Sequence, residues 1–178
     1  MKLISFPEFR QTFDYDCGAS AMQSILAFYG IDVGEKQVMK IAGTAKAGTS
    51  IKGIKKVARK FGLKAKSGAM SVKDIKKFIN KNIPVIVPLQ AWANNKNNKK
   101  VDWEKDWRDG HYVIAIGYDK EKFYFEDPAA VLRTYLAYDE FEKRWHDSDT
   151  NRKKYNHYGI IIYGKKPSYN LKKAKHMD

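Results

Sequence analysis

Residues 111–127 read HYVIAIGYDKEKFYFED, two runs of apolar and aromatic residues on either side of a charged turn at 119–122. This pattern predicts a β-hairpin, with His111 at the start of its first strand and Asp127 at the end of its second. Because the two ends of a hairpin meet, we expect these side chains to lie near each other. A carboxylate there can accept the imidazole N–H, fix the tautomer of the ring and stabilise the imidazolium. The stretch therefore predicts antiparallel strands that carry a histidine–aspartate pair.

Cys17, the only cysteine of the chain, stands where a loop enters a predicted helix at 18–29. The helix is predicted from apolar residues that recur at helical spacing, namely Met22, Ile25, Leu26 and Tyr29. A thiol at a helix N-terminus lies near the positive end of the dipole and unpaired backbone N–H groups, which both favour a thiolate. A lone cysteine cannot form a disulfide within the chain and is more often a small buried apolar residue. The expected histidine–aspartate pair favours the alternative, a nucleophile.

Other residues around these positions are candidates for the same site. Gln11 precedes Cys17 by six residues, and its amide can donate to the oxyanion of a tetrahedral intermediate. An exposed loop glutamine is the simpler interpretation of Gln11 taken alone. Gly18 is small and leaves the sulfur open to a substrate carbonyl. Gly110 and Trp107, just before the predicted hairpin, complete the set of candidate substrate-binding residues.

Hydrophobic periodicity in the rest of the chain predicts helices first and strands afterwards. Further helices are expected at 35–42, at 50–61 and from Ser71, where Asp74 completes a capping box. Strands are expected at 83–89, 132–136 and 157–163, and a short helix at 139–145 with Asp139 as its N-cap. This order predicts an α+β domain in which an N-terminal helical part packs on a C-terminal antiparallel sheet.

The expected organisation is a single domain over residues 1–164, with a polar insertion at 94–109 and a basic, frayed tail at 165–178. Three tryptophans lie in or near the insertion, and packing is a more common role for them than a cleft rim: Trp92, Trp103 and Trp107. The N-terminus lacks the apolar segment of a signal peptide, and the longest apolar stretch, 83–93, is too short to span a membrane. The sequence therefore predicts a cytoplasmic protein.

The chain has a formal net charge of +14, from 34 Lys and Arg against 20 Asp and Glu. This balance favours an anionic partner such as nucleic acid, a membrane surface or an acidic peptide. The lysines are dispersed along helices, however, which is more typical of a solvated surface. Asp14 and Asp16 are expected to face water or pair with lysines, because carboxylates near Cys17 would oppose a thiolate. Neither a metal nor a cofactor is expected, since the other histidines lack metal-type spacing: His146, His157 and His176.

Several of these motifs together resemble the C39 family of peptidases, over about residues 5–163: Gln11-x5-Cys17-Gly-Ala, the turns at 42–44 and 48–50, Gly110-His111-Tyr112-Val113 and Glu126-Asp127-Pro128. The resemblance implies a papain-like fold and a triad of Cys17, His111 and Asp127, with Gln11 in the oxyanion hole. It also implies cleavage after a double glycine in the leader peptides of bacteriocins and related secreted peptides. The best-known members are N-terminal domains of ABC exporters. This sequence shows no membrane or ATPase segment and carries the insertion, so it resembles stand-alone C39-like proteins.

Three functions follow from these observations. The preferred one is a cysteine peptidase that acts on a peptide or protein through an acyl-enzyme. The same triad could serve an amidase or acyltransferase with another substrate. The third is a non-catalytic papain-like module that binds an acidic peptide or nucleic acid, although the sequence holds no nucleic-acid motif. An activated Cys17 separates the first two from the third.

Overall fold

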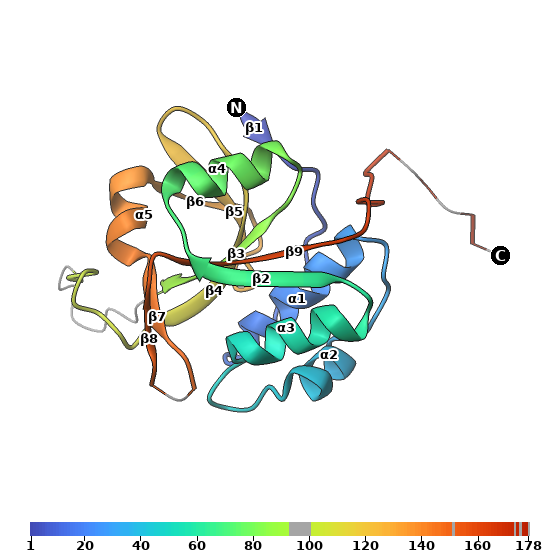
Figure 1. Ribbon diagram of the computed structural model, residues 1–178, viewed down its shortest axis with the longest axis horizontal. Coiled ribbons are helices and arrows are strands. Elements are labelled where there is room, and N and C mark those ends of the chain that lie inside the picture. The colour runs from blue at the N-terminus through green and yellow to red at the C-terminus, as the bar shows by residue number, and fades with distance from the viewer. Residues whose placement is uncertain (93–100, 151, 173, 175, 178) are drawn as a thin grey trace.

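The computed structural model describes residues 1–92, 101–150, 152–172, 174 and 176–177 (Figure 1). In these ranges the chain forms, in order, β1 (Lys2–Leu3), α1 (Cys17–Phe28), α2 (Glu35–Ala42), α3 (Ile51–Lys60), β2 (Lys64–Ala69), α4 (Val72–Asn80), β3 (Val85–Gln90), β4 (Gly110–Tyr118), β5 (Lys122–Glu126), β6 (Thr134–Ala137), α5 (Tyr138–Arg144), β7 (His146–Ser148), β8 (Lys154–Asn156) and β9 (Tyr158–Tyr163). The predicted α+β class with an antiparallel sheet is confirmed. The predicted limits of the domain stay a prediction, and the first part of the insertion, 94–100, lies outside the described residues.

One antiparallel sheet carries the fold, with the strand order β2-β9-β3-β4-β5-β6 and β1 paired to β4. Every residue of β3 is buried, as is most of β4, which explains their continuous apolar runs. β4 and β5 form the predicted hairpin, with a register shift between Ala115 and Gly117 and a pair at Ile114 and Glu126. This register pairs the last residue of β5 with Ile114, three residues after His111, so Asp127 follows close to the first part of β4.

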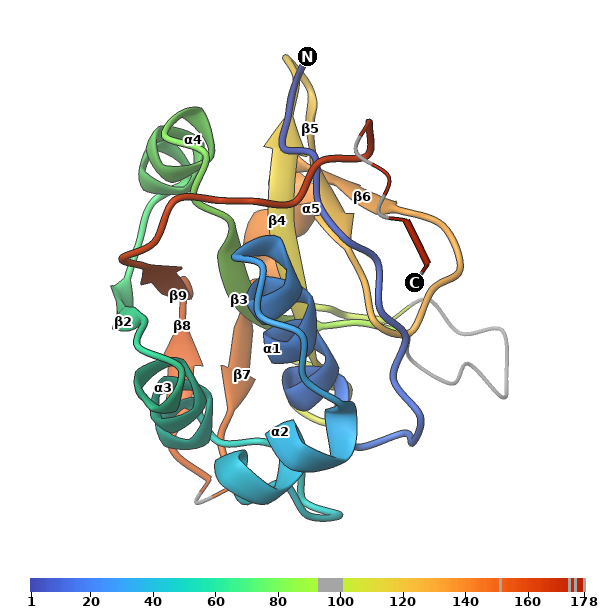
Figure 2. The ribbon, with the colours of Figure 1, turned by 90° about the vertical axis from the view of Figure 1, so that its right-hand side faces the viewer.

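The helix α1 lies against β4, in front of it in Figure 2, and runs from the site into the core. Its inward residues are among the most buried of the molecule, including Met22, Ile25 and Leu26, each 0% exposed. The helices α2 and α3 gather beside α1, away from α4 and α5 (Figure 1). Close packing of α2 on α3 depends on Gly53, where a Cβ atom would overlap the Ala42 carbonyl oxygen. The N-terminal helices thus hold α1 against the sheet.

Helix ends follow the sequence signals in two cases and depart from them in one. Ser50 caps α3 by accepting the Gly53 N–H at 3.1 Å. The capping box of Ser71 and Asp74 is present at the start of α4. The predicted cap Asp139 is wrong, because α5 begins at Tyr138 and the extended residue before it, Ala137, is the N-cap. The chain enters α5 directly from β6, so the geometry of that strand sets where the helix begins.

Two other expectations are wrong. The strand β2 interrupts the part of the chain expected to be only helical; its sequence, KAKSGA, lacks the apolar alternation that predicts a strand. It lies at the end of the sheet, where lysines are common because they oppose edge-to-edge association. The tail was expected to fray from residue 165, yet the Ser168 and Tyr169 N–H groups both donate to the Phe28 carbonyl, at 3.1 and 3.2 Å. The end of α1 therefore holds this part of the tail.

Candidate active site

Cys17 is the first residue of α1, one residue before the predicted start of the helix at residue 18, and it follows the N-cap Asp16. Its residue is 9% exposed, and it lines a cavity of about 380 Å³ together with Gly110 and Trp107. The sulfur is therefore set in the wall of a hollow and not sealed in the apolar interior. Gly18 does not line this cavity: a Cβ atom there would meet the Thr49 and Tyr112 side chains at 2.8 and 3.0 Å. Because Gly18 has no side chain, the Thr49 and Tyr112 side chains can pack closely against this part of α1.

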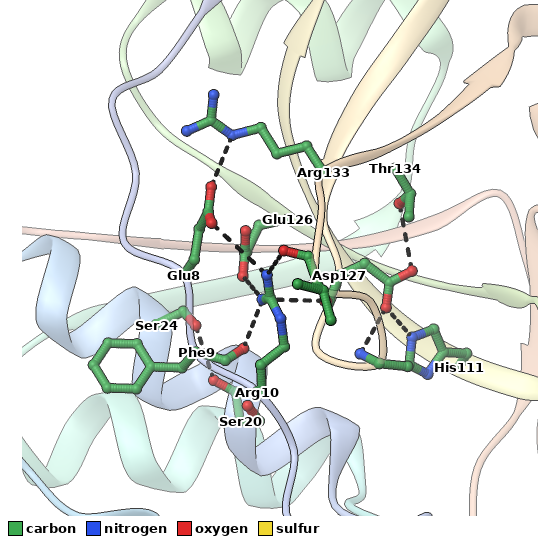
Figure 3. A network of polar contacts seen from close by, with 12 residues as sticks. Glu8, Phe9, Arg10, Ser20, Ser24, His111, Glu126, Asp127, Arg133 and Thr134 are labelled. Atoms are coloured by element: carbon green, nitrogen blue, oxygen red, sulfur yellow. Dashed lines mark hydrogen bonds and ion pairs between the residues drawn. The ribbon is translucent and has the colours of Figure 1, made fainter.

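His111 and Asp127 meet at the base of the hairpin, as the spacing predicts (Figure 3). The His111 Nε2 atom lies 2.7 Å from Asp127 Oδ1, and the two residues are 7% and 3% exposed. The carboxylate also accepts the Ala129 N–H at 2.9 Å on Oδ1 and the Trp92 indole N–H at 3.1 Å on Oδ2. Because both oxygens are held, the carboxylate fixes the orientation of the imidazole ring.

The electrostatics of these groups favour a charged imidazolium. Burial by itself lowers the pKa of His111, but its hydrogen bonds and charge interactions with Asp127 and Cys17 outweigh burial and raise the pKa to about 10. Burial also raises the pKa of Asp127, yet the His111 hydrogen bond and charge hold that pKa below its ordinary value. These interactions favour the protonated ring, with Asp127 on Nε2 and Cys17 as the other group that interacts with the imidazole.

Gln11 lies on the loop before Cys17, and its position is tied to the hairpin. Its backbone N–H donates to the Pro128 carbonyl at 3.0 Å, one residue beyond Asp127. Its side-chain Nε2 donates to the Phe13 carbonyl at 2.7 Å, while Oε1 is buried without a partner among the described residues. An amide nitrogen carries a second N–H. Its donation to an oxyanion stays a prediction.

A network of charged side chains joins the segment before Gln11 to β5, which ends one residue before Asp127 (Figure 3). Arg10 Nη1 contacts Glu126 Oε1 at 2.8 Å, and Arg10 Nη2 donates to the Val131 carbonyl at 2.7 Å. Glu126 is 1% exposed, so this ion pair is shielded from water on the Glu126 side. Sequence reasoning missed this contact, since Arg10 and Glu126 are separated by 116 residues and no periodic pattern relates them.

The prediction that Asp14 and Asp16 both face water or pair with lysines is wrong for Asp16. Its residue is 0% exposed, and both carboxylate oxygens accept the Phe13 N–H at 3.2 Å, which closes the loop before Cys17. Asp14, in contrast, lines the cavity beside Cys17. A local side chain to backbone bond of this kind is common for aspartate in turns, and it explains why burial is tolerated.

The three tryptophans have different surroundings. Trp92 is 57% exposed and adopts a left-handed φ of 59°. Its indole N–H donates to Asp127 Oδ2, a contact that the sequence did not predict. Trp103 stacks under the Arg144 guanidinium, 3.6 Å from its carbon to the ring centroid. Trp107 packs against His146, with 4.5 Å between ring centroids. Only Trp107 of these three lines the cavity that contains Cys17.

Within the ranges that the structure describes, no helix is long and apolar enough to cross a membrane. The same residues hold no group of three or more His, Cys, Asp or Glu side chains arranged to bind a metal.

The sheet, the helix that begins at a cysteine, and the histidine–aspartate pair define a papain-like peptidase fold. Three solved structures share it, each under 25% identical in sequence. The peptidase domain of Streptococcus ComA, a bi-functional ABC transporter involved in quorum sensing, has a TM-score of 0.66 at 20% identity, over 91% of this chain and 97% of that one. A double glycine motif protease from an AMS/PCAT transporter, in complex with the leader peptide, gives 0.65 at 22%, over 93% and 94%. A C39-like peptidase from Bacillus anthracis gives 0.68 at 18%, over 94% and 100%.

Sequence comparison assigns the chain to a family. A family model described as Peptidase C39 matches residues 5–148, and the chain belongs to this family. The Lactococcin-A transport/processing ATP-binding protein LcnC of Lactococcus lactis subsp. lactis is 30% identical over 138 residues, 76% of this chain and 17% of that protein. The Lactococcin-G-processing and transport ATP-binding protein LagD of Lactococcus lactis subsp. lactis is 29% identical over 134 residues, 73% and 16%. The chain therefore spans about a sixth of the length of these relatives.

Proposed function

We propose that this chain is a cysteine peptidase in which Cys17 is the nucleophile, His111 its base and Asp127 the residue that orients the histidine. The observation that carries the proposal is the buried pair of His111 and Asp127, with 2.7 Å between Nε2 and Oδ1, and with Cys17 as a further group that interacts with the same ring. Membership of the Peptidase C39 family supports peptide hydrolysis as the reaction.

The reaction follows from this geometry. The Cys17 thiolate attacks the carbonyl carbon of the scissile bond, and the negative charge moves to the carbonyl oxygen. The Cys17 backbone N–H, at the start of α1, and the Gln11 amide are the proposed donors to this oxyanion. The protonated His111 ring then donates its proton to the leaving amine, which breaks the C–N bond and leaves a thioester. His111, now neutral, accepts a proton from water as the water attacks the thioester and restores Cys17.

The proposed substrate is a peptide or protein cut after small residues, such as the double glycine of a leader peptide. One structural neighbour is named as a double glycine motif protease in complex with its leader peptide, and relatives are named as lactococcin processing proteins. Because the chain spans only part of those relatives, their transport partners are not carried over. Cytoplasmic localisation stays a prediction from the sequence.

Incubation with double-glycine peptides, followed by mass spectrometry, tests this function. We expect cleavage directly after the second glycine by the wild-type protein and none by Cys17→Ala, whose removed sulfur leaves the fold intact. Cleavage by both proteins at the same rate would contradict the role of Cys17. Cleavage of an isopeptide or of an ester alone, with peptides left intact, would favour the amidase or acyltransferase alternative.

A further inference from the structure

Several residues that line the cavity beside Cys17 have no role in the proposed mechanism. The hairpin of β7 and β8 forms one wall of this cavity and contributes Asp147, Ser148 and Asp149. Cys17 and Tyr112 line the same cavity, so a peptide bonded to the sulfur would place neighbouring residues within reach of the hairpin. The side chains on this wall therefore bear on which residue is accepted there.

Asp147 is the buried carboxylate of this wall, at 9% exposure. Its Oδ1 atom accepts the Ser148 N–H at 2.7 Å and the Gln90 amide at 3.2 Å. Its Oδ2 atom has no hydrogen-bond partner in the part of the chain that the structure describes, and the residue lines the cavity. One oxygen thus anchors the side chain, and the other is left to accept from a ligand.

Gly110 makes this placement possible. A Cβ atom at Gly110 would overlap Asp147 Oδ1 and would lie 2.7 Å from Oδ2. The carboxylate therefore occupies the space where residue 110 would carry a side chain, directly beside His111 on β4. Gly110, expected from the sequence to bind substrate, would then act by admitting the carboxylate that does so.

Acidic side chains outnumber basic ones around the cavity, whereas basic residues outnumber acidic ones in the whole chain. The chain has a net charge of +14, whereas the cavity is lined by three carboxylates and two cations: Asp14, Asp147, Asp149, Lys46 and Arg108. Arg108 is 91% exposed in its side chain and lies 3.6 Å from Asp106, so it points to solvent beside a partner of its own. Asp149 already accepts the Lys153 N–H and the Tyr155 hydroxyl, both at 3.0 Å. Among the described residues that line the cavity, Asp147 is the buried carboxylate with one oxygen left to accept a hydrogen bond.

From these contacts we propose that the cavity is a subsite for a lysine or arginine side chain of the substrate, with Asp147 Oδ2 as the acceptor. The proposal rests on the proposed peptidase function and adds a preference for a basic residue close to the scissile bond. The buried Asp147 carboxylate has lost hydrogen bonds to water, and a charge-assisted hydrogen bond from a substrate cation would replace them. An acidic substrate residue would be repelled by the negative charge of Asp147. The site thus selects against the acidic peptides that the overall charge of the chain would attract.

A charge scan of the substrate tests the proposal. Peptides with one double glycine carry lysine, norleucine or glutamate at each of the three positions on either side in turn, and kcat/KM is measured for each. At one position we expect the wild-type protein to prefer lysine over norleucine by about 10-fold, and Asp147→Asn to lose that preference. Asn keeps the Oδ1 acceptor for Ser148 and Gln90 but has an amide nitrogen in place of Oδ2, so it removes both the charge and the acceptor proposed for the substrate. Asp139→Asn, the same exchange on the exposed start of α5, is the matched control and should keep the wild-type ratio.

A binding measurement separates this proposal from the peptidase function. The Kd values of the lysine and norleucine peptides for Cys17→Ala, and for Cys17→Ala with Asp147→Asn, are compared by fluorescence anisotropy. If no peptide is cleaved but the lysine peptide binds more tightly only when Asp147 is present, the subsite stands and the peptidase function fails. Equal Kd values and equal rates for lysine and norleucine at every position would overturn the subsite, whether or not cleavage occurs.

The pH dependence of the preference adds a second readout. Burial raises the pKa of Asp147 to about 6, so the carboxylate is charged above that pH and neutral below it. The lysine to norleucine ratio should therefore fall as the pH is lowered through about 6 in the wild-type protein and stay flat in Asp147→Asn. Other charged groups near this carboxylate are His111, Asp149, Asp14, Lys46 and Arg108, and they are the same in both proteins. A ratio that falls equally in both would assign the pH effect to one of those groups.

Discussion

The two halves of the candidate active site are held by different kinds of contact. On the sheet side, hydrogen bonds fix the pair: the Asp127 carboxylate binds the His111 ring, the Ala129 N–H and the Trp92 indole. On the helix side, Cys17 is positioned by packing, since α1 is buried along its length and Gly18 fits closely against its neighbours. A substitution can remove a hydrogen bond with little change in side-chain volume, whereas a substitution that alters close packing always changes the volume that is filled. Changes to the hydrogen bonds that hold His111 should therefore alter chemistry, and changes to the packing around α1 should alter stability.

The largest expected effect comes from the sheet side. Asp127→Ala removes the acceptor that holds the His111 ring, so the imidazolium loses both its orientation and its stabilising charge. We expect kcat/KM for a double-glycine peptide to fall by about 10²- to 10⁴-fold while the melting temperature changes little. Asp139→Ala, an exposed aspartate of α5, serves as control and should retain wild-type activity. Full activity in Asp127→Ala would remove this residue from the mechanism.

The next effect belongs to the helix side, away from the chemistry. Gly53→Ala adds a methyl group that overlaps the Ala42 carbonyl oxygen, so α2 and α3 must separate. We expect the free energy of unfolding, measured by urea denaturation, to fall by about 1–3 kcal/mol. Gly68→Ala is the matched control, because a Cβ atom there has no neighbour within 4 Å, and its stability should stay close to wild type. Equal losses in both variants would show that packing between α2 and α3 is not what matters.

The smallest effect concerns Arg10 and Glu126, which join the two sides. Burial raises the pKa of Glu126 to about 7 although Arg10 opposes the shift. In the folded state Glu126 therefore keeps its proton at pH values where the unfolded chain has lost it. Its contribution to stability falls as the pH rises from about 4.5 to about 7.

This contribution can be isolated by comparison with Glu126→Gln, which cannot titrate. Between pH 5 and pH 7.5, urea denaturation should show a smaller loss of stability in the variant than in the wild-type protein. The difference reports the shift that remains after Arg10 has opposed it, because the pKa of about 7 already includes the interaction with Arg10. The same loss in both proteins would exclude Glu126 as the titrating group.

Local patterns in the sequence predict a large part of this molecule. The hairpin from 111 to 127 predicts the contact of His111 and Asp127, because sixteen residues with a central turn leave little choice of geometry. Helical periodicity likewise predicts α1, with its start placed at residue 18, one residue after the observed start at Cys17. The C39 resemblance then relates these two local features, which periodicity alone could not place in space.

The missed features depend on contacts between distant segments. Arg10 meets Glu126, Trp92 meets Asp127, and Asp147 lies over Gly110, and none of these pairs has a periodic signal. The buried Asp16 was missed for another reason: its acceptor role depends on the exact path of the loop, which charge patterns do not predict. Long-range polar contacts of this kind become visible only when the fold is known.

The rate at which iodoacetamide alkylates Cys17 tests the central claim most directly, because the chain has no other cysteine. Rates are compared at pH 6 between the wild-type protein and His111→Ala, with mass spectrometry to count the attached groups. If the His111 imidazolium stabilises a thiolate at Cys17, the wild-type protein should react at least about 10-fold faster than the variant. Equal rates in the two proteins at pH 6 would contradict the pairing of Cys17 with His111.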